Sequence, residues 1–504
     1  MIAAAKASNC DGRWLDQVAA AEKYVANQGG VAGVRDRYGQ DRTFSVPILA
    51  NAAMAGTVPW HEVAALPFEA ACVPQRFYNL LQLPVVSYAI PALVAIGLVK
   101  FHNDPPRNPF TRFVRALCTR KALRVLERIQ PASGGFLEAI PLTSFVAMGL
   151  IKSGRRDHPV VDRAIKFLLD SFREEGSWPI DTNLATWNTT LTVNAIGQSW
   201  PEDWKAETDW RPTLDWVMSC QNTTVHPYTG AAPGGWGWSD LSGAVPDADD
   251  TPGAMLSLDL LTRNVDWDSA IIDRMKSAAT LGAKWLLGLQ NRDGGWPTFC
   301  KGWGRLAFDR SGTDITAHVI RGLSAWKSDL VDLPFEKAIE RGFRFIEQRQ
   351  NRDGSWNPLW FGNQDNPDDV NPCYGTAKVL LAYRDSGRFD TPAARNGLNW
   401  VVENQHSEGG WGGGKSIKRI DSNLGCGTVE ETALCLEALL AGDLLANRAA
   451  IERGLNWLVS AIEQGEIVRS RPIGFYFARL WYDEQHYPIV FALSALGIAL
   501  KRLK

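Results

Sequence analysis

Gln290-Asn-Arg-Asp-Gly294-Gly-Trp296 is the stretch that decides the fold, because its pattern Gln-x-x-x-Gly-x-Trp occurs again further along the chain. The glutamines of the three full copies are 60 and 55 residues apart, which leaves room for an outer helix, a turn and an inner helix in each repeat. The other full copies are Gln350-Asn-Arg-Asp-Gly354-Ser-Trp356 and Gln405-His-Ser-Glu-Gly409-Gly-Trp411, and degenerate relatives are Gln130-Pro-Ala-Ser-Gly134-Gly-Phe136 and Phe172-Arg-Glu-Glu-Gly176-Ser-Trp178.

The residue types of this pattern suit the end of a helix. Glutamine can hydrogen-bond backbone groups that a helix end leaves unpaired, and glycine permits the left-handed turn that follows. Tryptophan can stack on that turn and join neighbouring repeats. We therefore predict that these residues are structural and that the chain is all-α, with layered helices closed into α/α toroids. We expect two domains, 1–175 and 176–504, the second carrying the full copies of the pattern.

The bulk composition excludes several classes of protein. The chain has 504 residues, 45% of them apolar, so it can bury sizeable cores. Its formal charge of −2 gives no indication of a nucleic-acid partner. The eight cysteines are scattered without a paired motif, which argues against a zinc ribbon or a disulfide framework and suits a reducing compartment. No signal peptide is visible in the first thirty residues.

An acidic cluster stands out between the repeats. Asp247, Asp249 and Asp250 lie within four residues and precede an apolar helical pattern, so we expect them at a helix N-terminus. One interpretation is a helix cap or a solvated acidic turn. Another is a divalent-metal site, since clustered aspartates bind magnesium beside diphosphate substrates.

The setting of the cluster favours a third interpretation. Trp236 and Trp238 precede it, and crowded carboxylates resist ionising together, so one can stay protonated near neutral pH. An alkene is a poor base and needs such an acid in a site that excludes water. Aromatic faces then stabilise carbocations without trapping them. Together these features indicate a site for cation-driven cyclisation.

At this point the sequence resembles a known family, the squalene–hopene cyclases, over nearly all of the chain. The resemblance rests on the repeated Gln-x-x-x-Gly-x-Trp pattern and on the Asp-x-Asp-Asp-Thr element after a Gly-Gly-aromatic run. It implies proton-initiated cyclisation of squalene or a similar polyprene to a polycyclic triterpene. It also implies two α-barrel domains around a hydrophobic cavity, a monotopic membrane protein, and no metal or organic cofactor.

The resemblance also implies roles for particular residues. Asp249 matches the proton donor, with Asp247 and Asp250 as its carboxylate partners. His318, in Asp314-Ile-Thr-Ala-His318, matches a histidine that hydrogen-bonds this acid, and Tyr374 matches a tyrosine that helps to reprotonate it. Five aromatic residues match rings that line the cavity, although a core role is the alternative for each: Trp187, Trp238, Phe299, Trp360 and Phe475.

Three departures from the family pattern bear on this expectation. The chain starts inside the family's N-terminal barrel, so we expect an incomplete barrel that closes differently or is completed by a homodimer mate or another partner chain. Arg471 and Arg479 fall among C-terminal aromatic residues, where a cation beside a carbocation is unfavourable. They therefore point outward, or the product is not hopene. Thr251-Pro252 replaces the usual Thr-Ala after the acid.

Residues 83–128 are the expected membrane-contacting segment. Residues 83–99 are apolar and uncharged but are interrupted by Pro91, which suits a buried or half-inserted helix better than a spanning one. Residues 100–128 carry eight Lys and Arg, either on a solvated helix face or on a surface that docks on anionic lipid. We predict peripheral, monotopic attachment at the cytoplasmic face, without a transmembrane span.

Three other functions stay open on the sequence alone. The first is a cyclase of a shorter prenyl substrate, including a prenyl diphosphate, for which we find no clear basic or magnesium motif. The second is a non-cyclase α/α toroid such as a protein prenyltransferase subunit, for which the Asp, Cys and His zinc ligands are not evident. The third is a half-complex protein that is inactive alone.

Overall fold

Helices dominate the chain, as predicted. The computed structural model describes residue 2 and residues 14–39, 42–199, 209–417, 424–475 and 480–503. Within these ranges the β-structure is limited to two short antiparallel pairs. The pairs are β1 (Trp296–Pro297) with β2 (Ser311–Gly312), and β3 (Ile473–Phe475) with β4 (Leu480–Tyr482). The all-α class is thus confirmed.

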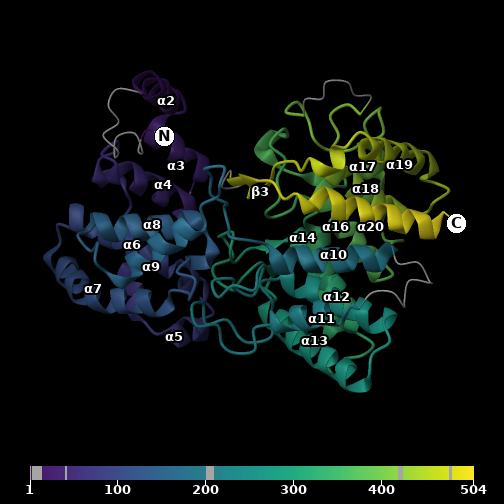
Figure 1. Cartoon of the computed structure of the whole chain (residues 1–504), viewed down its shortest axis with the longest axis horizontal. Helices are drawn as coiled ribbons and strands as arrows, with labels where there is room; N and C mark the ends of the chain where they lie inside the picture. The colour runs from purple at the N-terminus through teal and green to yellow at the C-terminus, as the bar shows by residue number, and fades with distance from the viewer. Residues whose placement is uncertain are drawn as a thin grey trace. The chain divides into compact units, whose positions relative to one another are not determined.

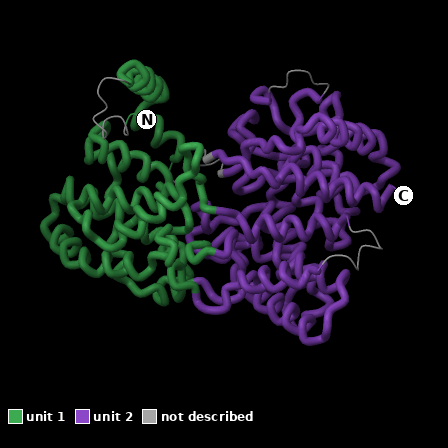
Figure 2. Tube along the Cα trace, in the orientation of Figure 1, with its two compact units in different colours: residues 1–182, 226–230, 241–244 green, residues 183–225, 231–240, 245–504 purple. Residues whose placement is uncertain are grey.

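The chain divides into two compact units, which Figure 2 colours separately. The first comprises residues 1–182, 226–230 and 241–244, and the second comprises residues 183–225, 231–240 and 245–504. The predicted boundary lies after residue 175, whereas the first unit runs to residue 182. The prediction also lacks residues 226–230 and 241–244, two short segments of the loop before the acidic cluster that belong to the first unit. A motif-based boundary has no means of detecting such returns of the chain.

The first unit is built around one apolar helix, α6 (Val85–Asn103), which contains Pro91 and packs against α7 and α8. It is long and apolar enough to cross a membrane, but 72% of its most apolar window is buried inside the protein, as in a core helix. The other helices are α2 (Leu15–Asn27), α3 (Gly30–Tyr38), α4 (Arg42–Met54), α5 (Gln75–Leu80), α7 (Pro109–Ile129), α8 (Ile140–Lys152) and α9 (Pro159–Asp170), with 3-10 turns at Trp60–Glu62, Phe68–Cys72 and Phe136–Glu138.

Six inner helices of the second unit form a closed ring, in which each packs against the next and the last returns to the first. Figure 1 labels all of these helices. In chain order they are α10 (Ala185–Ser199), α12 (Asp250–Asn264), α14 (Thr313–Trp326), α16 (Pro372–Asp385), α18 (Val429–Ala441) and α20 (His486–Arg502). The connecting outer helices are α11 (Arg211–Ser219), α13 (Ser269–Leu289), α15 (Phe335–Gln348), α17 (Pro392–Glu403) and α19 (Arg448–Glu463), with 3-10 turns at Pro367–Asp369 and Glu466–Val468.

The inner and outer helices differ in their pattern of burial. Nearly every residue of α18 is buried, because this helix has neighbours on all sides. In α15, by contrast, burial recurs every three or four residues, from Phe335 through Ile339 to Phe343 and Ile346. Because an outer helix returns the chain between successive inner helices, the inner helices begin at the same end of the ring. This unit is therefore an α/α barrel.

The repeated glutamine joins one layer of the barrel to the next. In each copy its side-chain amide donates to the carbonyl of the pattern glycine and to a backbone carbonyl of the following outer helix. For Gln290 these acceptors are Gly294 at 2.8 Å and Ala338 at 2.9 Å. Gln130, Gln221, Gln350 and Gln405 make the same pair of bonds. Gly294 has φ +97°, the left-handed conformation that the pattern predicts.

The repeated tryptophan fixes the same joint from inside. Trp296 is fully buried, and its indole N–H donates to Leu286 O at 2.7 Å. A Cβ on Gly342 of the next outer helix would come within 2.9 Å of the indole, so a side chain there would displace the ring. Trp236, Trp356 and Trp411 repeat both contacts, with Gly282, Gly397 and Gly454 as the opposing glycines.

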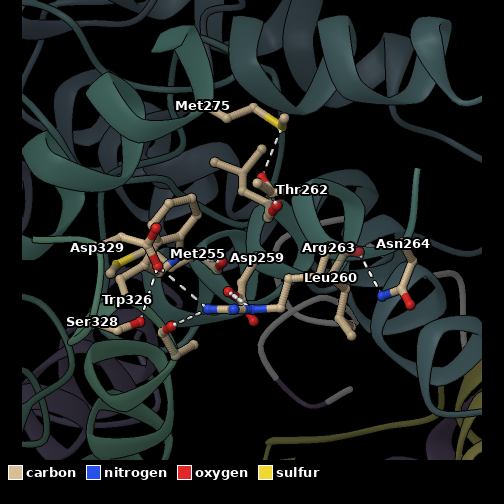
Figure 3. Close-up of polar contacts among 12 residues, drawn as sticks. Met255, Asp259, Leu260, Thr262, Arg263, Asn264, Met275, Trp326, Ser328 and Asp329 are labelled. Carbon is tan, nitrogen blue, oxygen red and sulfur yellow. Dashed lines mark hydrogen bonds and ion pairs between the residues drawn. The ribbon is translucent and has the colours of Figure 1, made fainter. Parts of the chain in front are cut away.

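Hydrogen bonds join α12 to the C-terminal end of α14 (Figure 3). Arg263 of α12 donates to Asp259 at 2.6 Å and to Ala325 O at 3.1 Å. Trp326 of α14 donates from its indole to Met255 O of α12 at 2.8 Å. The two helices that carry the acidic cluster and His318 are thus held in a fixed relation.

Candidate active site

A threonine sets the register of four successive inner helices. The backbone N–H of each repeat tryptophan donates to a hydroxyl in the first turn of the next inner helix: Thr251, Thr316, Thr376 and Thr432, at 2.9 to 3.0 Å. Two positions before each threonine stands an ionisable residue, in the order Asp249, Asp314, Tyr374 and Glu430. Equivalent positions on parallel neighbouring helices lie at the same end of the barrel. The repeat therefore gathers these four groups at one end of it.

Asp247 performs the capping role that one interpretation assigned to the cluster. Its Oδ1 accepts the backbone N–H groups of Asp249 and Asp250 at 2.9 and 2.7 Å, at the start of α12. Asp249 makes no capping bond with its own side chain. That side chain is 19% exposed, and Oδ1 lies 3.6 Å from Nδ1 of His318. The cap thus leaves the Asp249 carboxyl free to act.

All three aspartates resist ionisation. Burial, together with the neighbouring Asp249 charge, raises the pKa of Asp247 to about 7. Burial raises the pKa of Asp249 to about 6. Burial and then the Asp247 charge raise the pKa of Asp250 well above its usual value. A raised carboxyl pKa means that the protonated form persists towards neutral pH, so this cluster holds acidic protons where exposed aspartates have none.

His318 and Tyr374 lie with the acid. The 3.6 Å separation between His318 and Asp249 is too long for a hydrogen bond in this structure, but the two side chains are direct neighbours. Burial, followed by the charges of Arg321 and Lys378, lowers the pKa of His318 well below 6.5, so its imidazole is neutral. Burial and the Asp249 charge raise the pKa of Tyr374 well above its usual value, so it remains a proton donor.

The predicted rings form two groups. Phe299 packs edge-to-face against Trp238 and Trp360, with centroids 6.1 and 6.0 Å apart. Trp187 packs edge-to-face against His318 at 6.0 Å and donates to the Tyr487 hydroxyl at 2.9 Å. Trp187 and Asp249 are therefore both direct neighbours of His318. Phe475 lies in β3, and its side chain is outside the described residues.

Arg471, one of the two unexpected C-terminal arginines, is paired with a buried carboxylate. Its guanidinium donates to Glu466 at 2.7 Å, and the Glu466 side chain is 6% exposed. Its backbone N–H donates to Glu430 at 2.8 Å. Glu466 also accepts from Arg469 at 3.0 Å, so the two arginines share one carboxylate, and the predicted conflict between Arg471 and a carbocation is reduced but not removed. Arg479 lies outside the described residues.

Within the described ranges, no group of three or more His, Cys, Asp or Glu side chains has an arrangement that would hold a metal ion. In the acidic cluster, one Asp247 oxygen is engaged by two backbone N–H groups.

Sequence reasoning missed four groups at this site: Asp314, Phe308, Lys378 and Tyr487. Burial, together with the Asp249 charge, raises the pKa of Asp314 to about 7. The signal for Asp314 was present, because it holds the same place before Thr316 as Asp249 holds before Thr251. Phe308 packs against Phe299 with centroids 5.6 Å apart, a contact that its position in sequence does not reveal.

The fold and site together define a class: an α/α-barrel protein with a buried cluster of protonatable carboxyls at one end of the barrel. A sequence profile of the squalene-hopene cyclase C-terminal domain matches residues 184–501. The chain belongs to the squalene–hopene cyclase family.

Individual relatives agree with this assignment. The squalene–hopene cyclase of Bradyrhizobium diazoefficiens is 29% identical over 62% of this chain and 48% of its own length. The probable squalene–hopene cyclase of Sinorhizobium fredii is 27% identical over 76% of this chain and 60% of its own length. The chain thus spans about half the length of the curated relatives it matches. Among solved structures, the ent-copalyl diphosphate synthase of Streptomyces platensis is similar with a TM-score of 0.49 and 16% sequence identity. The match covers 94% of this chain and 91% of the synthase chain.

Proposed function

We propose that the chain cyclises squalene or a similar polyprene to a polycyclic triterpene, with Asp249 as the proton donor. The observation that carries the proposal is the Asp249 carboxyl, whose raised pKa of about 6 keeps it protonatable and which lies 3.6 Å from His318, itself packed edge-to-face against Trp187. Its partners Asp247 and Asp250 keep the cluster short of full ionisation.

The chemistry follows from these groups. The Asp249 carboxyl transfers its proton to one carbon of a terminal double bond, and the other carbon becomes a tertiary cation that the next double bond attacks. Rings such as Trp187, Trp238 and Phe299 stabilise the successive cations through their faces. The last cation loses a proton or captures water. Tyr374, which stays protonated, helps to return a proton to Asp249.

A substrate comparison tests this function. We expect the purified chain in detergent to convert squalene to cyclic products without added metal, and to convert geranylgeranyl diphosphate poorly with or without magnesium. Gas chromatography with mass spectrometry separates the products. Preferential turnover of the diphosphate would instead support the cyclase of a shorter prenyl substrate. No turnover of either would support a protein that is inactive alone.

We also propose that α7 docks on a membrane surface. Phe110, Phe113 and Leu117 recur at helical spacing and are 61% to 73% exposed. Exposed Arg112 and Arg120 lie on the same helix. An apolar helix face with basic residues beside it is typical of interfacial attachment to anionic lipid.

Replacing Phe110, Phe113 and Leu117 together by serine is expected to weaken vesicle binding at least about tenfold, because three apolar side chains no longer enter the lipid. Co-sedimentation with phosphatidylglycerol-containing vesicles measures it. Leu445→Ser, which changes an 82% exposed leucine outside this helix, is the control. Unchanged binding of the triple variant would contradict the proposal. Completion of the N-terminal barrel by a second chain stays a prediction, which the oligomeric state in solution tests.

A further inference from the structure

Glu430 is a buried glutamate with one carboxylate oxygen left unpaired. It lies in the first turn of α18, where its Oε1 accepts the backbone N–H of Arg471 at 2.8 Å. The residue is 6% exposed, and among the described residues its Oε2 has no hydrogen-bond partner. A buried carboxylate oxygen without a donor is costly, so this oxygen indicates a ligand that donates a hydrogen bond to it.

Two neighbouring side chains do not supply that donor. The Arg471 guanidinium donates to Glu466 instead, at 2.7 Å. Glu431 is itself an acceptor, and its Oε2 already receives the Thr428 hydroxyl at 2.8 Å and the Gly413 N–H at 2.6 Å. Of the two adjacent glutamates, Glu431 therefore holds the surrounding backbone in place, whereas Glu430 keeps an oxygen for another molecule.

Glu430 lines a cleft whose walls run from exposed to buried residues. Gln364 and Ser416 are exposed, whereas Glu430 and Tyr487 are buried. Further buried polar residues line the same cleft, namely Asn363, Asn371, Thr428 and Glu431. A bound water needs two to four polar partners, and this lining offers them. Water is therefore the hydrogen-bond donor that fits the free oxygen of Glu430.

Glu430 lies at the same end of the barrel as the acid, on the opposite side of the ring. It stands two positions before Thr432, as Asp249 stands before Thr251, and both threonines accept the N–H of a repeat tryptophan. The two carboxyl groups thus occupy equivalent positions on α18 and α12. These helices are three steps apart in either direction around the ring, so the two positions face each other across it.

Direct contacts join the cleft to the acid. Tyr487, which lines the cleft, accepts the indole N–H of Trp187 at 2.9 Å. Trp187 packs edge-to-face on His318, and His318 lies 3.6 Å from Asp249. Two aromatic rings therefore lie along the path from the cleft to the acid, and aromatic rings stabilise carbocations.

We propose that Glu430 is the base that ends the reaction, by taking a proton from a water molecule in the cleft as that water attacks the final carbocation. The water oxygen forms a bond to the cationic carbon, one of its O–H bonds breaks, and the proton passes to the Glu430 carboxylate. The product is a cyclic alcohol, and Glu430 then loses its proton to solvent along the cleft. The proposal rests on the proposed function and decides between its two endings, loss of a proton and capture of water.

The basicity of Glu430 suits this step. Burial raises the pKa of Glu430 to about 7, so its carboxylate is a stronger base than that of an exposed glutamate. Near neutral pH both the carboxylate and the acid are present. The carboxylate is thus available to accept a proton and can be restored after each turnover.

The first test is the product made from squalene at pH 7 in water enriched in the heavy oxygen isotope, analysed by gas chromatography with mass spectrometry. We expect the wild type to form a cyclic alcohol that carries the heavy isotope. Glu430→Gln keeps an acceptor for the Arg471 N–H but cannot take up a proton. The share of alcohol is therefore expected to fall at least about tenfold, with cyclic alkenes in its place, and Glu430→Asp should restore part of it.

Glu403→Gln, at an exposed glutamate at the end of α17, is the matched control and should leave the products unchanged. Only alkenes from the wild type, or an unchanged share of alcohol from Glu430→Gln, would overturn the proposal. A merely structural role for Glu430 would lower the total conversion without changing the ratio of alcohol to alkene. That result would overturn the proposal as well.

A second measurement does not depend on activity or on any variant. In a crystal structure of the wild-type chain, we expect an ordered water within hydrogen-bond distance of Glu430 Oε2. Absence of that water from a well-ordered cleft would overturn the proposal whether or not the chain cyclises squalene. If the water is present but squalene gives no cyclic product, the proposed function fails, and the catalytic role of Glu430 fails with it.

Discussion

Asp249→Asn is expected to lower the rate of squalene cyclisation by about 10³- to 10⁴-fold, because an amide has no proton acidic enough for an alkene. The substitution keeps the shape of the side chain, and the Asp247 cap on α12 involves only the backbone of residue 249. Product formation per enzyme, followed by gas chromatography at pH 6, measures the effect.

The same variant is expected to be at least as stable as the wild type. Because the pKa of Asp249 is raised from 3.8 to about 6 by folding, its carboxylate costs folding free energy that grows as the pH rises from about 4 to 6 and is constant above. Above pH 7 the asparagine variant should gain up to roughly 2–3 kcal/mol, and near pH 4 the gain should nearly vanish. Asp240→Asn, at an exposed residue of the same loop, is the control for both measurements. Loss of activity accompanied by lower stability at pH 8 would indicate a structural role for Asp249.

Trp296→Ala is expected to lower the free energy of unfolding by about 3–5 kcal/mol. The indole is fully buried, donates to Leu286 O and fills the space that Gly342 leaves on the next outer helix. Alanine would leave a cavity at a joint between two repeats. The shift in the urea unfolding midpoint of the second unit, followed by circular dichroism, measures it.

Trp303→Ala is the matched control, since this indole is 56% exposed and belongs to the same connection between α13 and α14. We expect a change within about 0.5 kcal/mol there. Trp296→Phe should fall between the two, because it keeps part of the ring volume but loses the N–H donor. Similar midpoints for Trp296→Ala and Trp303→Ala would contradict the role of the pattern tryptophan as a joint between layers.

The repeat pattern was legible in sequence where its spacing is regular. Gln290, Gln350 and Gln405 are each followed by glycine four residues later, and all three make the same two bonds. Gln221 makes them too, but twelve residues separate it from Gly234, so no fixed pattern finds it. The longer segment between Gln221 and Gly234 is tolerated because the glutamine bonds require only that Gly234 lies beside Gln221. The number of residues in the intervening loop does not affect them.

The acidic cluster was predictable because its three aspartates lie within four residues of sequence. Lys378 was not, because it is remote in sequence from Asp249 and lies on α16, two inner helices further along the ring than α12. The pairing of Arg471 with Glu466 was hidden for a related reason. The partner of a charged side chain is set by the local backbone conformation, here the turn between Glu466 and Arg471. Residue types alone do not predict that pairing.

The most direct test of the central claim, that Asp249 protonates a polyprene, is cyclisation of squalene in deuterium oxide. The carboxyl proton exchanges with solvent before turnover, and the proton that it delivers becomes part of a carbon–hydrogen bond in the product. The account predicts a cyclic product one mass unit heavier than that formed in ordinary water, and no such product from Asp249→Asn. A cyclic product without deuterium, or a labelled one from the asparagine variant, would contradict it.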